Sequence, residues 1–394
     1  METRNYINGR FIDSFSKRKV YVINPADQSK VGFVEEALDE EIDLAFDAAS
    51  KAYKSRVLQD MDAVAKSNLM RLIASKLREY KTYGSMLLSK ENGKSIEQCA
   101  GEFEGAAVIF DYYAGLTDKI ENKLIPSGRD TFNYVVLEPY GVSLQIIPWN
   151  YPMQIIGRSV GAALATGNTC ILKPAAEACL TALAFGALTR KAGLPDGVLN
   201  IVTGSGDTGA YLSQHSGIDH ISFTGSVSTG IKIQQSAAQN VVPVTLELGG
   251  KSPQIVFNDA DLDAALPFLV NAGIQNAGQT CSASSRILVQ RENYAKVVSM
   301  MTEKYKMLLV GAAMDDLDIG PLISKKQHEI VSDYIRQGTD LELAAKGKFN
   351  ADINNDGFYC LPHLFVDVPT DHSLAQNEIF GPVQIIIPFE DEDH

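Results

Sequence analysis

Residues 142–174 read VSLQIIPWNYPMQIIGRSVGAALATGNTCILKP, and this segment carries the strongest signal for the fold. Two short apolar runs of strand length, 142–147 and 169–172, stand at its ends. Between them the apolar side chains recur at helical spacing, at Met153, Ile156, Val160 and Leu164. A strand, a helix and a second strand in this order indicate a right-handed crossover between parallel strands. The segment therefore predicts an open parallel sheet covered by helices.

The alternation continues toward the C-terminus. After 169–172 the sequence predicts a helix at 180–188, strands at 199–202 and 219–223, and a helix that opens near Ser226. A second series follows residue 250, with a strand at 254–257, a helix at 264–274 and a strand at 286–289. We therefore predict an α/β fold with two open α/β domains and Rossmann-type parallel sheets. The glycine pair 249–250 would be a hinge, and the cleft between the domains the default site for chemistry.

Toward the N-terminus the first hundred residues are predicted to be mostly helical. One apolar helix face comprises Leu44, Ala45, Ala48 and Ala52, and a second comprises Leu69, Leu72, Ile73, Leu77 and Tyr80. A further strand is expected at 131–137, joined to 142–147 through a turn at 139–141.

Charge and composition narrow the range of functions. The net charge of −13 gives an acidic surface that repels nucleic acid and anionic lipid, so we expect neither as a partner. The N-terminus lacks the apolar run of a signal peptide, and prolines interrupt the longest uncharged stretch, 139–157. The five cysteines are widely spaced and odd in number, which argues against disulfides and a metal site. A cytoplasmic location fits best.

Cys281 is the candidate nucleophile. Its neighbours, in NAGQTCSASSR (276–286), are small and polar, so the sulfur is expected to be accessible. Most free cysteines of cytoplasmic proteins are buried and inert, and composition alone favours that interpretation. The same interpretation is kept for the other four: Cys99, Cys170, Cys179 and Cys360.

Two polar residues are candidates to assist it. Glu247 ends an apolar strand, 241–246, and either caps a turn or projects into a cleft as a general base. Asn150 lies between two prolines in IPWNYP (147–152), which suits a rigid oxyanion donor, although an ordinary turn asparagine is the alternative.

Nucleotide binding has three candidate segments. Lys173 ends a strand and is kept out of the next helix by Pro174, so it either reaches a nucleotide or is a surface lysine. Residues 204–209, GSGDTG, match a dinucleotide fingerprint, but their strand is not the first of its series and no acid follows at the required spacing. We expect this loop to line an adenine pocket at most. Gly225 and Ser226, at the next helix N-terminus, are the better pyrophosphate site.

Taken together, these segments resemble the NAD(P)-dependent aldehyde dehydrogenase superfamily, from the N-terminus to about residue 389. The matching pieces are PWNYP (148–152), LKP (172–174), FTGS (223–226), Gly230, ELGGK (247–251), GQTC (278–281) and EIFGP (378–382). Several such motifs in the right order make a chance match implausible. They therefore favour Cys281 as a nucleophile over the interpretation as a buried, inert cysteine.

The resemblance implies a role for each matching residue. Cys281 would attack the aldehyde, Asn150 and the Cys281 backbone N–H would hold the oxyanion, and Glu247 would activate the water that hydrolyses the thioester. NAD or NADP would be the cofactor. The residues implied to bind it are Trp149, Lys173, Glu177, Gly225, Ser226, Gly230, Glu378 and Phe380. The substrate would be a small-molecule aldehyde.

The family architecture implies the domain bounds. Residues 1–120 and 138–249 would form the dinucleotide-binding domain and 250–394 the catalytic domain. Residues 121–137 would form a β arm used for oligomerisation, and a homodimer or homotetramer is expected if the C-terminal part is present. Family chains usually continue past EIFGP, so we expect the catalytic domain to be C-terminally incomplete here.

The chain also departs from the family pattern in ways that bear on specificity. NAD-preferring relatives often carry a glutamate three positions after the lysine, where this chain has Ala176 followed by Glu177, so we expect tolerance of NADP. Arg158 falls where relatives line the substrate entrance, and it either binds an anionic aldehyde or forms a structural ion pair. A catalytically silent family member and a CoA-acylating dehydrogenase remain the alternative functions, and the presence of Glu247 disfavours the latter.

Overall fold

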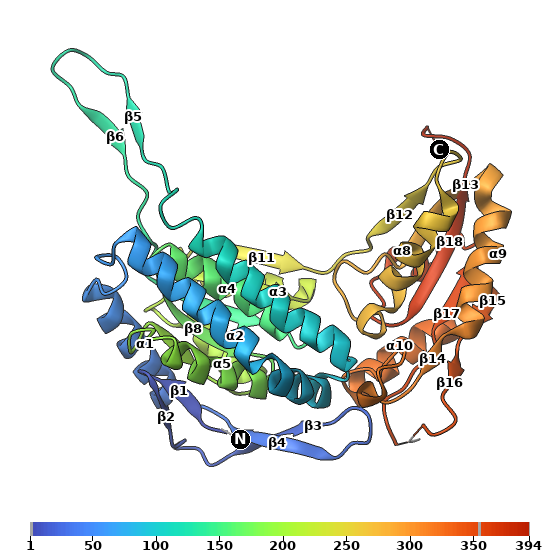
Figure 1. Cartoon of the computed structure of the whole chain (residues 1–394), viewed down its shortest axis with the longest axis horizontal. Coiled ribbons are helices and arrows are strands. Elements are labelled where there is room, and N and C mark those ends of the chain that lie inside the picture. Colours follow the sequence, from blue (N-terminus) through green and yellow to red (C-terminus); the bar gives the residue numbers. More distant parts are fainter. Residues whose placement is uncertain (1–2, 354–355, 394) are drawn as a thin grey trace. The chain divides into compact units, whose positions relative to one another are not determined.

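Seven strands form the first sheet, in the order β11-β10-β7-β8-β9-β1-β2. Figure 1 labels β1, β2, β8 and β11 of this sheet. The computed structural model describes residues 3–353 and 356–393. The strands are β1 (Asn5–Ile7), β2 (Arg10–Ile12), β7 (Val142–Ile147), β8 (Thr169–Pro174), β9 (Leu199–Ile201), β10 (His220–Gly225) and β11 (Val244–Leu248). The four central strands β10, β7, β8 and β9 are parallel, as predicted.

The helices of this part of the chain are α1 (Asp39–Lys54), α2 (Ala63–Asn92), α3 (Ile96–Ala114), α4 (Pro152–Ala165), α5 (Leu180–Lys191), α6 (Gly206–Gln214) and α7 (Val227–Gln239), with a short 3-10 turn η1 (Ala176–Ala178). α1, α4, α5, α6 and α7 contact the strands of the sheet, and α3 packs on α4. β7 and β8 are buried at every position, which is why they appear in the sequence as unbroken apolar runs. The predicted apolar face of α4 is confirmed, since Met153 and Val160 are completely buried.

The prediction of a mostly helical N-terminus is wrong for residues 3–35. Besides β1 and β2, this part contains β3 (Lys19–Ile23) and β4 (Lys30–Glu35), which pair with each other. β1 pairs antiparallel with both β2 and β9, so its stability comes from a strand almost 200 residues away. Leu44 and Leu72, assigned to buried helix faces, are also exposed, at 45% and 49%.

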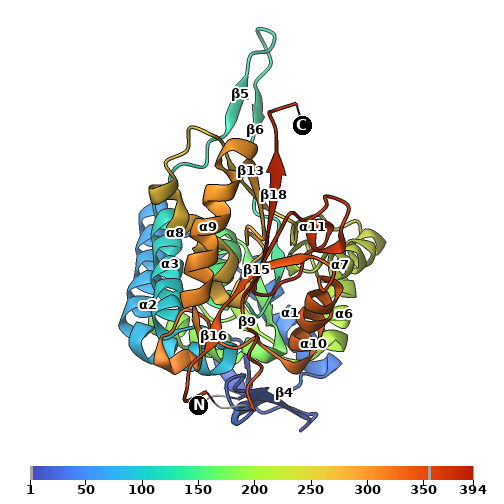
Figure 2. The same ribbon diagram turned by 90° about the vertical axis from the view of Figure 1, so that its right-hand side faces the viewer.

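Five strands form the second sheet, in the order β12-β13-β18-β17-β15. The elements of this part are β12 (Pro253–Val256), α8 (Leu262–Ile274), η2 (Gln275–Gly278), β13 (Arg286–Gln290), α9 (Arg291–Met307), β14 (Leu309–Val310), η3 (Ala313–Asp315), α10 (Lys325–Gln337), β15 (Glu342–Lys346), β16 (Lys348–Phe349), β17 (His363–Val366), α11 (Ser373–Gln376) and β18 (Val383–Phe389). β12, β13, β18 and β17 are parallel, and β15 is an antiparallel edge. Figure 2 shows β13, β15 and β18 of this sheet with helix α9.

The contacts within the chain divide it into two compact units. The first runs to Val22 and includes Gly32–Gly84 and Ala100–Glu247, whereas the second includes Ile23–Val31, Ser85–Cys99 and the chain from Leu248 onward. The sheet of seven strands belongs to the first unit and the sheet of five to the second. The functional assignment of the predicted domains, and their bounds, stay a prediction.

Residues 121–137 lie in a hairpin of β5 (Lys123–Ile125) and β6 (Asn133–Val135), which projects from the first unit (Figure 1). The expected strand at 131–137 is therefore present but shorter. Within the described residues, no helix combines the length and apolar character needed to cross a bilayer.

Candidate active site

The carboxyl ends of β7, β8 and β10 bring the nucleotide candidates of the first unit to one edge of its sheet. Ile146 on β7 is paired in register with Lys173 on β8 and with Phe223 on β10. Because these strands are parallel, the segments that leave them start side by side. They carry Trp149 and Asn150, η1, and Gly225 with Ser226.

Lys173 is buried to an unusual degree for a lysine, with 7% of its surface exposed. Burial lowers its pKa, while the nearby carboxyl groups of Glu177 and Glu36 act in the opposite direction. The ammonium group is therefore not the free surface lysine of the alternative interpretation. Glu177 itself lies in η1 and is exposed, next to the half-buried Ala176.

A helix opens near Ser226, as predicted, and Ser226 is the N-cap of this helix, α7. Its hydroxyl accepts a hydrogen bond of 3.3 Å from the backbone N–H of Thr229. Gly225 directly precedes Ser226. A Cβ atom at position 225 would lie 2.6 Å from Cζ of Phe223, which is too close for a side chain. Gly230 is buried on the same helix. The exposed amide groups of this helix start are suited to an anion.

The loop 204–209 is already engaged by an acid of the protein. Ser205 caps α6, and its backbone N–H donates to Oε1 of Glu36 at 2.9 Å. Burial raises the pKa of Glu36, but the hydrogen bonds from Ser205 and the ion pair with Arg18 outweigh burial, so its pKa is lowered overall. A charged carboxylate at this position repels a phosphate, which supports the preference for Gly225 and Ser226.

Asn150 is 5% exposed and lies in the four-residue link between β7 and α4. The start of α4 is held by Glu102, a buried residue of α3 that the sequence analysis did not identify. No local sequence pattern predicts a contact between residues so far apart in the chain.

In the second unit, segments from three motifs precede neighbouring strands at the amino edge of the sheet. β12, β13 and β18 are parallel neighbours, with Pro253 opposite Arg286 and Arg286 opposite Ile385. These segments are residues 248–251 of the ELGGK motif, the Cys281 loop and EIFGP. These segments contact one another directly. Gly278 packs on the carbonyl oxygen of Gly381, and Gly249 packs on the carboxyl group of Glu378.

Cys281 follows a tightly constrained turn. Asn276 and Ala277 have left-handed backbone angles, φ 51° and 54°, which residues other than glycine adopt only when their surroundings impose them. Gln279 is completely buried, and its Oε1 accepts a hydrogen bond of 2.9 Å from the backbone N–H of Ile323. The loop therefore holds the exposed Cys281 on a rigid base.

The remaining cysteines are all buried. Burial raises the pKa of the Cys360 thiol to about 12, and it also raises the pKa of Cys170. A thiol with a raised pKa is a poor nucleophile because little of it is ionised near neutral pH. Cys281 alone among the five is exposed, which agrees with the expected accessibility of its sulfur.

Glu378 lies near other charged side chains that have a buried nitrogen atom without a hydrogen-bond partner. Burial raises its pKa, and the backbone N–H of Gly250 and the charge of Lys251 oppose that effect. Among the described residues, Glu378 Oε1, Lys251 Nζ and Arg286 Nε are buried without a hydrogen-bond partner. An orphaned carboxyl oxygen is what a sugar hydroxyl of a nucleotide requires.

Glu247 lies inside β11 rather than after its strand, because β11 extends to Leu248. The predicted strand 241–246 is corrected to Val244–Leu248, and Glu247 is exposed. Phe380, in the EIFGP motif, has a left-handed φ of 55°, and its carbonyl oxygen accepts a hydrogen bond of 2.9 Å from Gln327.

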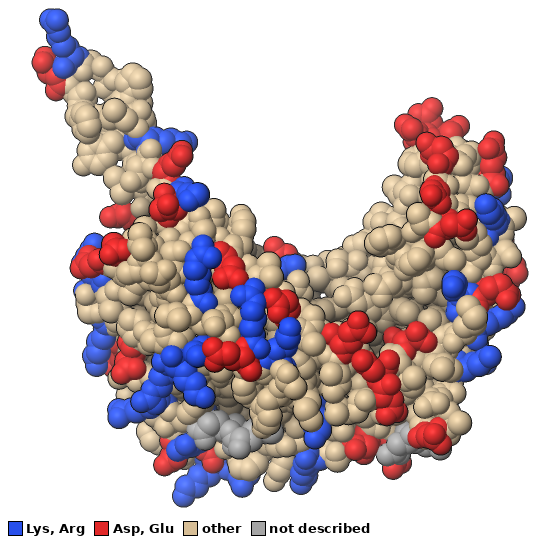
Figure 3. All heavy atoms as spheres, in the orientation of Figure 1, with Lys and Arg blue, Asp and Glu red and all other residues tan. Residues whose placement is uncertain are grey.

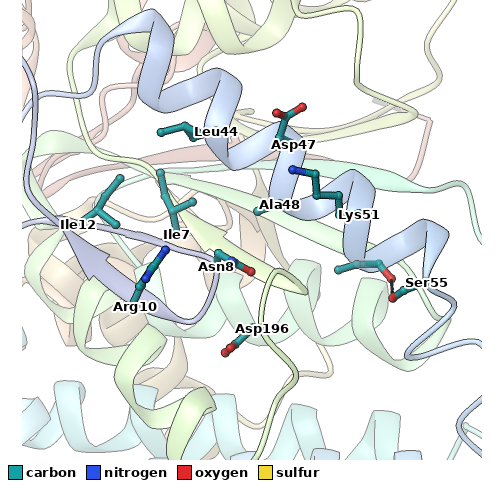
Figure 4. A pocket seen from close by; sticks show the side chains of 11 residues that line it. Ile7, Asn8, Arg10, Ile12, Leu44, Asp47, Ala48, Lys51, Ser55 and Asp196 are labelled. Carbon is teal, nitrogen blue, oxygen red and sulfur yellow. Dashed lines mark hydrogen bonds between the residues drawn. The ribbon is translucent and has the colours of Figure 1, made fainter.

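A cavity of about 390 Å³ lies on the first unit between α1 and the β1–β2 hairpin (Figure 4). It is lined by side chains such as Arg10, Asp47 and Lys51 and contains none of the predicted site residues. Over the described part of the chain, no cluster of three or more His, Cys, Asp or Glu residues is placed to hold a metal ion.

Comparison with known proteins identifies the family. Residues 11–394 match the sequence model of the aldehyde dehydrogenase family. Retinal dehydrogenase 2 of Homo sapiens is 39% identical over 400 residues, which cover 99% of this chain and 76% of that protein. The NAD+ complex of an aldehyde dehydrogenase from Bacillus cereus has a TM-score of 0.95 and 37% identity, covering 100% of this chain and 80% of that one. Betaine aldehyde dehydrogenase from Staphylococcus aureus in complex with NAD+ has a TM-score of 0.95 and 34% identity, covering 99% of this chain and 79% of that one. This chain therefore belongs to the aldehyde dehydrogenase family of enzymes.

Proposed function

We propose that this enzyme oxidises an aldehyde to a carboxylic acid with NAD or NADP, and that Cys281 is its nucleophile. The observation that carries the proposal is the contrast among the cysteines: Cys281 is exposed on a rigid loop, and the other four are buried. The position of Cys281 in the GQTC motif of the family supports the same assignment.

The reaction begins when the Cys281 thiolate attacks the aldehyde carbon. A carbon–sulfur bond forms, and the carbonyl electron pair moves to the oxygen. The Asn150 side-chain amide and the Cys281 backbone N–H donate to this oxyanion, and both belong to constrained segments, as preorganised stabilisation requires. When bound, the cofactor supplies an acceptor for the hydride that leaves the same carbon, so that a thioester on Cys281 remains.

Hydrolysis of the thioester completes the cycle. Glu247 accepts a proton from a water molecule, the resulting hydroxide attacks the thioester carbon, and the Cys281 thiolate leaves as the acid forms. The aldehyde is oxidised by two electrons, and water supplies the second oxygen. Glu247 is the group that CoA-acylating relatives typically lack, so we favour hydrolysis over transfer to CoA.

The family motifs provide candidate residues for each part of the nucleotide. In the first unit Lys173 and Glu177 would take the adenosine ribose, Gly225, Ser226 and Gly230 the pyrophosphate, and Trp149 would line the same edge. In the second unit Glu378 would take the nicotinamide ribose, with Phe380 packing nearby. The buried Lys173, the capped start of α7 and the orphaned Glu378 oxygen fit a group that presents hydroxyls and phosphates.

We also propose that the enzyme accepts NADP. Ala176 stands where NAD-preferring relatives often carry a carboxylate, and the exposed Glu177 is free to turn toward solvent. Paired measurements of kcat/KM with the two cofactors test this. Comparable values support the proposal, and a preference for NAD of more than about a hundredfold contradicts it.

The hairpin β5–β6 is proposed as the assembly arm of a homodimer or homotetramer. Its apolar side chains lie open to solvent, Leu124 at 65%, Phe132 at 76% and Tyr134 at 60%. Figure 3 shows charged side chains at the tip and base of the hairpin, with an uncharged stretch between them. Such a surface favours burial against another subunit.

The test of the function is cofactor reduction with a panel of aldehydes. Cys281→Ser should abolish turnover, whereas Ser282→Ala, a change at the next exposed position, should leave it within about twofold. Turnover that persists in Cys281→Ser would show that Cys281 is not the nucleophile. Absence of turnover in the native chain, with cofactor binding intact, favours the catalytically silent alternative, and turnover only with CoA favours the acylating one.

A further inference from the structure

Glu102 makes two hydrogen bonds to the start of α4. Its Oε1 accepts from the backbone N–H of Met153 at 2.8 Å and from that of Gln154 at 3.3 Å. The first N–H groups of a helix have no carbonyl partner within the helix, so an outside acceptor is needed when they are buried. Glu102 is 5% exposed, which makes these bonds hard for water to replace.

The sequence of α4 does not provide its own cap. Tyr151 occupies the N-cap position without a side-chain hydrogen bond to the helix, and Pro152 has no N–H. The acceptor comes instead from α3, which approaches α4 closely. A side chain on Gly157 would lie 3.3 Å from the Cα atom of Ala106, so the absence of one permits this approach.

The link that carries Asn150 is thereby fixed at both ends. At one end β7 is buried throughout and paired with β8 and β10. At the other, Glu102 holds the first free N–H groups of α4, three and four residues after Asn150. Only residues 148–152 lie between β7 and Met153, the first residue that Glu102 holds. A small displacement of the helix start would move the Asn150 amide directly.

We propose that Glu102 is a positioning residue for Asn150: its carboxyl group holds the start of α4 so that the amide points at the developing oxyanion. This inference rests on the proposed function, in which Asn150 donates to the oxyanion. A misplacement of a catalytic group by about 1 Å can lower the rate by up to a hundredfold. We expect Glu102→Ala to lower kcat about tenfold, less than removal of Asn150 itself.

The first experiment compares kcat with cofactor binding. Glu102→Ala should lower kcat and leave the dissociation constant of NAD within about twofold. Glu102→Gln, whose carbonyl oxygen still accepts, should recover most of kcat, whereas the shorter Glu102→Asp should not. Glu104→Ala is the matched control, because Glu104 lies on the same helix and pairs with Arg78 and Lys81 at the surface. It should keep the native kcat.

The second experiment is a double-mutant cycle with Asn150→Ala. If Glu102 acts through Asn150, adding Glu102→Ala to Asn150→Ala should change kcat by less than about twofold. An equal loss in both backgrounds would show a general structural role and overturn the inference, as would an unchanged kcat in Glu102→Ala alone. If Glu102→Ala does not fold, Glu102→Asp takes its place in the cycle.

The same cycle separates failure of the inference from failure of the proposed function. A normal kcat in Asn150→Ala would show that Asn150 does not stabilise the oxyanion, and it would contradict the inference as well. A strongly reduced kcat in Asn150→Ala, together with a native kcat in Glu102→Ala, removes the inference alone.

Discussion

Replacing Lys251 with methionine should make the folded chain more stable at neutral pH. Lys251 Nζ is buried without a hydrogen-bond partner among the described residues. Burial, followed by repulsion from Arg286, lowers its pKa from 10.5 to about 8, and Glu378 offsets only part of this. One unit of pKa corresponds to about 1.4 kcal/mol, so the buried charge costs about 3 kcal/mol of folding free energy. Methionine retains the apolar contacts of the stem and removes the charge.

The gain should depend on pH with a defined sign. The unfolded lysine keeps its proton up to pH 10.5, whereas the folded one loses it near pH 8. Between these values the unfolded chain binds more protons, so the native chain becomes more stable as pH rises. The advantage of Lys251→Met is therefore complete below about pH 8 and disappears above about pH 10.5.

Urea unfolding followed by circular dichroism, at about pH 7 and about pH 10, measures the gain in stability and its dependence on pH. Lys304→Met, a change at an exposed position of α9, is the control and should alter stability by less than about 0.5 kcal/mol. A lower urea midpoint for Lys251→Met at neutral pH would refute the reasoning. So would a gain that does not shrink as pH rises.

Four further outcomes are expected. Gly278→Ala should destabilise the chain by more than about 1 kcal/mol and slow alkylation of Cys281, because φ there is +73° and the carbonyl oxygen of Gly381 occupies the space; thermal unfolding and iodoacetamide kinetics measure the two effects. Gly249→Ala should displace the Glu378 carboxyl group and weaken NAD binding about tenfold in a calorimetric titration, with Gly250→Ala, where the space is open, as its control. Ser226→Ala removes the cap of α7 and should cost about 1 kcal/mol in thermal unfolding, which unchanged stability would contradict. Arg158→Leu should lower turnover of semialdehydes relative to neutral aldehydes, since Arg158 is exposed and has no acidic partner within residues 3–353 and 356–393; an unchanged ratio removes Arg158 from substrate selection.

The parallel cores could be predicted from sequence because their strands are buried on both faces. β7 and β8 therefore appear as unbroken apolar runs, and α4 shows a regular apolar stripe between them. The helix start predicted near Ser226 is confirmed, and it follows from equally local patterns. Local patterns of this kind require no knowledge of the rest of the fold.

The features that sequence missed depend on distant parts of the chain. β1 has three residues and is stabilised by pairing with β9, so no periodicity marks it. Glu102 acts on Met153, 51 residues away, through a side-chain bond to the backbone that leaves no pattern. The burial of Lys251 arises in the same way, because the groups around it come from separate strands and loops. The catalytic roles of Cys281 and Glu247 come from the family motifs and stay predictions.

The most direct test of the proposed chemistry is capture of the acyl intermediate on Cys281. Glu247→Gln, incubated with an aldehyde and NAD, should release about one equivalent of NADH per site and then stop, because hydrolysis has lost its base. Mass spectrometry of the digested protein should find the acyl group on the peptide that contains Cys281. Steady turnover by Glu247→Gln, or a burst without an acyl group on Cys281, would contradict the mechanism.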